Sequence, residues 1–153
     1  MMANQVEKKL SKKLFELLQK EQFVTLATVD HELGGPNKHA LSWLLAKDEK
    51  TILFAVNSRS KIVENIEKQP LIAITVVGVG STYSIMGKAK LLVENMEDLP
   101  LKLSLLELEI NEVHDVMFYG SRIVTEPVYE FIYDREAAEK LDKQVMAAIK
   151  KQK

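Results

Sequence analysis

TILFAVNSRSKIVENIEKQP, residues Thr51 to Pro70, is the stretch from which the fold can be worked out. Its first part, Thr51 to Val56, is an apolar run of β-branched and aromatic residues, which is typical of a buried strand. Polar turn-forming residues follow, and then apolar residues return at helical spacing up to Pro70, before which helical geometry is disfavoured. The stretch therefore predicts a strand, a tight turn and a short helix.

The turn, Asn57 to Ser60, carries residue types that suit an anion-binding site. The first N–H groups of a helix have no partner inside the helix, and the peptide dipoles leave partial positive charge there. Arg59 and Lys61 add two cations, and Ser58 and Ser60 add two hydroxyl groups, so a phosphate group would fit this position. The same residues also fit an ordinary polar turn, in which Ser58 or Ser60 caps the helix.

The composition restricts the function classes. The 153 residues predict one domain, residues 1–153, and 46% of them are hydrophobic, which is enough for a substantial core. Lys and Arg number 21 against 22 Asp and Glu, so no basic excess indicates nucleic-acid binding, and near-neutrality is compatible with an oligomer. The absence of cysteine excludes disulfides and thiolate sites, and the three histidines show no metal-ligand spacing. Without a long apolar segment, we expect a cytoplasmic protein that does not bind membranes.

Helices are expected at both ends of the chain. Asn4 and Glu7 resemble a capping pair for a helix over about residues 4–20, with a stripe of leucines from Leu10 to Leu18. Asp134 is expected to cap a helix that continues to about residue 151. Met96 to Leu99 suits a short helical turn, and the segment around His114 and Asp115 an irregular or short helical one.

Alternating and β-branched stretches predict the strands between these helices. Besides Thr51–Val56, we expect strands at Phe23–Val29, Lys38–Lys47, 71–77, 81–93, about 101–110 and 128–133. Leu105 and Leu106 interrupt the alternation of their strand, which predicts a β-bulge there. Short polar turns join the strands, so antiparallel pairing is expected. The predicted fold class is mainly β with flanking helices: about six of these seven stretches form a six-stranded antiparallel barrel, with an open sandwich as the alternative.

Three motifs in this order resemble the FMN-binding split-barrel family, the pyridoxamine 5′-phosphate oxidase-like proteins. The strand-to-helix turn matches at Phe54, Val56, Asn57, Ser60 and Lys61, followed by a closing proline at position 70. FVTLATVD at 23–30 is similar to the first strand of the family, and YSIMGKAKLL at 83–92 to a later strand with a G-K-A signature. The resemblance covers roughly residues 22–94 and implies a split β-barrel.

The resemblance implies FMN as the cofactor, bound at the interface of a homodimer. Phosphate binding is expected from Ser58, Arg59, Ser60 and Lys61, with Asn57 shaping the turn, and Val56 is also a candidate cofactor-binding residue. Contacts with the ribityl chain and the flavin ring are expected from three more residues, Ser42, Trp43 and Thr82. For Trp43 a plain core position fits equally well, and Thr82 also fits a strand surface. No residue stands out as a nucleophile or acid–base pair, so the catalytic residues stay unassigned.

This chain departs from the family pattern at three places. One is the C-terminal tail: oxidases of pyridoxine phosphate end with a basic and aromatic tail for substrate and dimer contacts, and this chain does not show it. Many relatives have a second basic residue where this chain has Ile62, and oxidases of pyridoxamine phosphate place an arginine near positions 40–42, where this chain has Ala40, Leu41 and Ser42. We therefore expect an oxidoreductase or flavin reductase-like protein with a nicotinamide or other small-molecule electron donor. The alternative is a non-catalytic module that carries flavin, haem or deazaflavin, or that senses stress.

Overall fold

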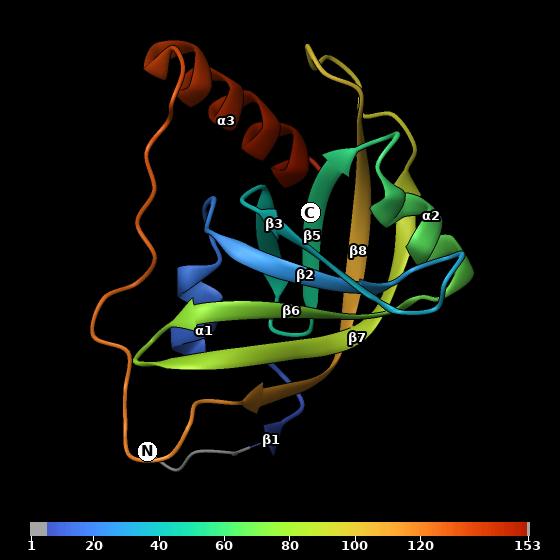
Figure 1. The fold of residues 1–153 in the computed structure, drawn as a ribbon. Helices are drawn as coiled ribbons and strands as arrows, with labels where there is room; N and C mark the ends of the chain where they lie inside the picture. Colours follow the sequence, from blue (N-terminus) through green and yellow to red (C-terminus); the bar gives the residue numbers. More distant parts are fainter. Residues whose placement is uncertain (1–5, 153) are drawn as a thin grey trace.

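The computed structural model describes residues 6–152, and within this range eight strands form one sheet and three helices accompany it (Figure 1). All strand pairs are antiparallel. The strands are β1 Val6–Glu7, β2 Val24–Val29, β3 Pro36–Leu41, β4 Leu44–Asp48, β5 Thr51–Asn57, β6 Leu71–Gly78, β7 Ser81–Val93 and β8 Leu103–Asp115. The helices are α1 Lys12–Leu17, α2 Lys61–Lys68 and α3 Arg135–Lys150.

The order of the strands makes the sheet curl. Hydrogen bonding runs in the order β3-β2-β6-β7-β8-β5-β4, with β1 paired to β8. The two ends of this path, β3 and β4, are joined by only Ser42 and Trp43. Because two residues cannot cross a flat sheet of seven strands, the sheet must bend until its edges approach each other. The prediction of a mainly β, antiparallel split barrel with flanking helices is confirmed, although eight strands replace the expected six within the described range.

Two hydrophobic clusters hold the layers together, and β8 contributes to both. Inside the barrel, Phe54, Leu106 and Leu108 are fully buried beside side chains of α1 and α2. On the outer face of β4, β5 and β8, Leu103 and Leu105 pack against the apolar side of α3. Because both faces of β8 are buried, two consecutive positions of this strand, Leu105 and Leu106, are both apolar. The expected bulge at this point of β8 is wrong, since β8 pairs with β5 without a register shift; the extra residue lies opposite, in β7, between Leu91 and Val93.

The N-terminal helix is shorter than expected. Asn4 lies outside the described residues, and Val6–Glu7 pair with β8 as a strand instead of starting the helix. The helix begins after Ser11, whose hydroxyl accepts a hydrogen bond from the Leu14 N–H group. At the other end of the chain, Asp134 caps α3 as predicted. In the described part of the chain, no helix is long and apolar enough to cross a membrane.

Four further expectations are corrected. The single strand expected at 38–47 is two strands, β3 and β4, and Pro36 already pairs with Val29. Residues 96–99 form a turn and not a helix, while His114 and Asp115 belong to β8. Residues 128–133 form no strand with any other described residue, although they are rich in strand-forming side chains.

Candidate functional site

The strand, turn and helix predicted at 51–68 are confirmed as β5, a turn and α2. Asn57 shapes the turn: its side-chain Oδ1 accepts from the Arg59 N–H group at 2.9 Å, and its carbonyl oxygen accepts from the Ser60 N–H group at 2.9 Å. Ser60 is the N-cap of α2, because its hydroxyl accepts from the Ile62 N–H group at 3.1 Å. Ser58 does not cap the helix and instead donates its N–H group to the carbonyl of Lys102.

The two cations of the turn differ in their surroundings. The Lys61 ammonium group pairs with Oδ2 of buried Asp30, which follows β2. This hydrogen bond lowers the pKa of Asp30 well below its usual range, helped by the N–H groups of Leu33 and Glu32, and it raises the pKa of Lys61. Arg59 is exposed, and its guanidinium group forms no ion pair with the described residues. Arg59 is therefore the more available cation for an anion at this turn.

A cleft of about 300 Å³ lies between the end of β3 and the turn before α2. It brings together five of the nine residues proposed from the sequence: Ser42, Trp43, Val56, Asn57 and Ser60. Its other walls come from His39, Ala40, Leu41, Ala55 and Ile62. Residues from β3, β5 and α2 meet here because the curled sheet brings its two edge strands together at Ser42 and Trp43.

His39 was not predicted as a site residue, and its environment in the cleft is unusual. It lies at a half-buried position of β3, where exposed and half-buried residues alternate. Its Nδ1 is buried without a hydrogen-bond partner, the only such side-chain atom in the described range. An unpaired buried polar group costs about 1–3 kcal/mol, which a hydrogen-bonding ligand in the cleft would offset. A polar residue at an inward position of the strand was the only signal for His39 in the sequence.

Trp43 forms part of the core and also lines the cleft. Its ring packs against the cluster beneath α3, and its indole N–H donates to Oδ1 of Asp142 on that helix at 2.8 Å. Burial, followed by nearby carboxylates, raises the pKa of Asp142, although the hydrogen bond from Trp43 acts in the opposite direction. Burial also raises the pKa of Tyr129, which lies within hydrogen-bonding reach of the Ser42 side chain. α3 and the segment before it thus support this wall of the cleft.

Thr82 does not line the cleft. It lies on β7, which is separated from β3 by β2 and β6 in the sheet. Its hydroxyl contacts Sδ of Met117 at 3.6 Å, and its carbonyl accepts from the Val116 N–H group. Within one copy of the chain, Thr82 is therefore not grouped with the other proposed site residues.

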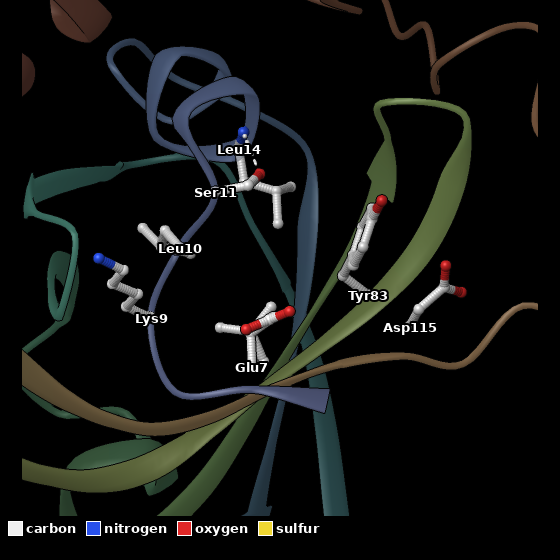
Figure 2. A pocket seen from close by; sticks show the side chains of 8 residues that line it. Glu7, Lys9, Leu10, Ser11, Leu14, Tyr83 and Asp115 are labelled. Carbon is white, nitrogen blue, oxygen red and sulfur yellow. Dashed lines mark hydrogen bonds between the residues drawn. The ribbon is translucent and has the colours of Figure 1, made fainter. Parts of the chain in front are cut away.

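A second cavity, of about 230 Å³, lies where the chain before α1 crosses β7 and β8 (Figure 2). Leu10 and Leu14 face the ring of Tyr83 across it. Among its polar residues, Asp115 is engaged by the Ser81 hydroxyl at 2.7 Å and the Met117 N–H group at 3.0 Å. The cleft near α2 is the stronger candidate for the functional site, because it groups residues that were proposed from the sequence. No group of three or more His, Cys, Asp or Glu residues in the described range could hold a metal ion.

Comparison with protein-family models decides the classification. The model for pyridoxamine 5′-phosphate oxidase matches residues 10–123. The chain belongs to this family. The match extends from the residue before Ser11 to the segment after β8, so it includes the whole cleft. A search of curated protein sequences finds no match.

Solved structures agree with the family assignment at the level of the fold. HupZ of Group A Streptococcus superposes with a TM-score of 0.59 at 18% identity, covering 74% of this chain and 98% of that one. General Stress Protein 26 of Bacillus anthracis gives a TM-score of 0.55 at 12% identity, covering 70% and 94%. An F420 reductase gives 0.51 at 19% identity, covering 62% and 90%. At identities this low, the superpositions show a shared fold and nothing more. Members of the pyridoxamine 5′-phosphate oxidase family are often dimers.

Proposed function

We propose that the cleft between β3 and α2 binds FMN, and that the protein is a homodimeric flavoprotein with the flavin at the subunit interface. The observation that carries this proposal is the grouping of Ser42, Trp43, Asn57 and Ser60 around one cleft at the N-terminus of α2. A helix N-terminus favours a phosphate group because its N–H groups and dipole attract negative charge. Arg59 adds positive charge beside it, whereas the charge of Lys61 is already paired with Asp30.

The other walls of the cleft suit the remaining parts of the cofactor. Trp43 offers an aromatic surface, with its indole N–H fixed by Asp142, for a flat ring system. The unpartnered Nδ1 of His39 offers a hydrogen bond to a polar edge of the ligand. Bound flavin supplies the two-electron chemistry, while the protein supplies orientation and electrostatics. This division of roles explains why no nucleophile or acid–base pair stands out in the cleft. It favours an oxidoreductase or flavin reductase that uses a nicotinamide or another small-molecule electron donor.

Binding can be tested with the single tryptophan as the probe. Because Trp43 is the only Trp of the chain and lines the cleft, FMN should quench its fluorescence, and riboflavin, which lacks the phosphate, should bind more weakly. Arg59→Gln should reduce the preference for FMN over riboflavin. Arg135→Gln is the matched control, since Arg135 is exposed on α3 and, among residues 6–152, forms an ion pair with Glu139 alone. If saturating FMN neither quenches the folded protein nor raises its melting temperature, the proposal is wrong.

A non-catalytic carrier or sensor is the second candidate function. Its support is the lack of an arginine at Ala40, Leu41 and Ser42, all of which line the cleft. The likeness to a General Stress Protein and to an F420 reductase adds a stress-linked role or a deazaflavin as candidates. Anaerobic mixing with NADH or NADPH separates the two functions. Reduction of bound flavin faster than that of free FMN supports the enzyme, and binding without acceleration supports the carrier.

A further inference from the structure

The side chain of Lys61 points away from the cleft that we propose for the flavin. Its neighbours on both sides, Ser60 and Ile62, line the cleft, but Lys61 is not among the lining residues. Consecutive residues of a helix face in different directions, and Lys61 faces the end of β2, which lies beside α2 (Figure 1). There its ammonium group meets Oδ2 of Asp30 at 2.5 Å. The first cation of α2 is therefore bound outside the candidate site.

Asp30 is the fixed partner of this pair, and Lys61 is the flexible one. Only 4% of the Asp30 side chain is exposed, against 45% of Lys61. The second carboxylate oxygen of Asp30 accepts from two N–H groups of the β2–β3 turn, and its backbone N–H group donates to the Gly35 carbonyl at 2.7 Å. A lysine side chain is a compact charge on a flexible four-carbon stem. The position of the ammonium group is therefore set by the carboxylate.

Further carboxylates favour the charged lysine at this place. The hydrogen bond with Asp30 raises the pKa of Lys61 despite the opposing effect of burial. The negative charges of Asp30, Glu32 and Glu64 raise this pKa as well. Lys61 is thus charged, but its charge is balanced on the side of the turn that faces β2. Of the two cations of the turn, Arg59 alone has no ion pair with the described residues.

We infer that Asp30 is a positioning residue that keeps the Lys61 ammonium group away from the phosphate of the bound ligand. Asp30 thereby lowers the preference of the cleft for phosphorylated over unphosphorylated flavin. The inference rests on the proposed function, because it takes the flavin phosphate to lie at the N-terminus of α2. It concerns the one carboxylate that decides how much of the positive charge of the turn reaches this phosphate.

A phosphate group at the N-terminus of α2 has two ways to bind. It can bind with Arg59 and the helix N–H groups alone, or it can draw Lys61 across from Asp30. The second way leaves a buried carboxylate without its counter-ion, which is unfavourable. In both cases the phosphate gains less than it would from an unpaired lysine, whose charge-assisted hydrogen bond has no competing acceptor.

A double-mutant cycle between Asp30 and Lys61 tests the inference. The measured quantity is the ratio of the affinities for FMN and riboflavin, from the quenching of Trp43, because a merely structural change affects both ligands equally. Asp30→Asn keeps an oxygen that accepts from the N–H groups of the turn, but it removes the charge that holds Lys61. The ratio should rise about tenfold or more in Asp30→Asn. Adding Lys61→Gln to Asp30→Asn should abolish this gain.

Lys61→Gln in the wild-type background is a second, independent measurement. Because Asp30 already holds the lysine, the ratio should fall by less than about threefold. Asp48→Asn is the matched control. Asp48 also accepts from a turn N–H group, that of Lys50 at 2.9 Å, but it lies at the opposite end of β5 from Asn57. Its replacement should leave the ratio unchanged.

Circular dichroism at the temperature of the titration verifies that each variant is folded. An unchanged or smaller ratio in Asp30→Asn overturns the inference. A larger loss than threefold in Lys61→Gln alone also overturns it, since Lys61 would then already contact the phosphate, and this result decides by itself if Asp30→Asn does not fold. Both results leave flavin binding intact. A wild type that binds neither flavin contradicts the proposed function, and the inference with it.

Discussion

The ammonium group of Lys61, the first residue of α2, lies 2.5 Å from Oδ2 of Asp30, directly after β2. The other oxygen of this carboxylate accepts from the N–H groups of Glu32 and Leu33, at 2.9 Å each. One buried side chain therefore organises the β2–β3 turn and fixes the start of the helix beside the cleft.

Replacing Asp30 should make the stability of the folded protein less dependent on pH in the acidic range. The hydrogen bond with Lys61 holds the pKa of Asp30 well below its usual value, so this carboxylate stabilises the folded protein above its unfolded-state pKa of about 3.9. The stabilisation is lost as the pH falls further, because the folded protein must then protonate a paired group. Asp30→Asn should lower the melting temperature at neutral pH, and the difference from wild type should shrink below a pH of about 4.

Thermal unfolding followed by circular dichroism over this pH range measures the effect. Asp98→Asn is the control, because Asp98 lies in an exposed turn and forms no ion pair with the described residues. A difference between Asp30→Asn and wild type that is the same at all pH values would contradict the role given to this pair.

The two serines of the turn should differ in their effect on stability. Ser60 caps α2 through its hydroxyl, so Ser60→Ala should cost about 1 kcal/mol in the free energy of unfolding. Ser58 contributes its backbone N–H group to Lys102, and alanine keeps that group, so Ser58→Ala should stay within about 0.5 kcal/mol of wild type. Urea denaturation of the ligand-free proteins compares them directly. Equal losses in the two variants would mean that the cap does not stabilise the helix.

The fold could be predicted from the sequence wherever a residue pattern has only one structural interpretation. Thr51–Lys68 has a strand composition, turn formers and helical spacing in succession, and each became the expected element. Leu105 and Leu106 were misinterpreted because burial on both faces of β8 has the same pattern as a bulge. Residues 128–133 have the composition of a strand, but no other described strand of the same copy pairs with them.

The grouping of residues around the candidate cleft was predictable where neighbours in sequence are neighbours in space, as at Asn57 and Ser60. Ser42 and Trp43 joined them only because the resemblance to the family placed them there. The pairing of Lys61 with Asp30 depends on the meeting of β2 and α2, which no local pattern reveals. The same holds for His39, whose importance lies in an unpaired buried atom.

Gly87, in the G-K-A motif of β7, should tolerate no side chain. A Cβ atom built there would overlap with the carbonyl oxygen of Glu109 on β8, next to the register shift between Met86 and Gly87. Since this neighbour is backbone, Gly87→Ala should cost about 3 kcal/mol or more in the free energy of unfolding. Gly35→Ala is the control, as nothing lies within 4 Å of its Cβ position. Similar denaturation midpoints for the two variants would show that β8 can move away.

His39→Leu should change the stability of the ligand-free protein and its affinity for FMN in different directions. Leucine is of similar size and removes the buried Nδ1 that has no partner, so the ligand-free protein should be as stable as wild type or more stable. If the cleft binds FMN through this atom, the affinity should fall about tenfold, which corresponds to about 1.4 kcal/mol. His39→Asn keeps a hydrogen-bonding group and should lose less affinity. Fluorescence titration of Trp43 and thermal unfolding measure both quantities on the same sample. A less stable ligand-free His39→Leu that binds FMN as wild type does would assign this histidine to the core and not to the site.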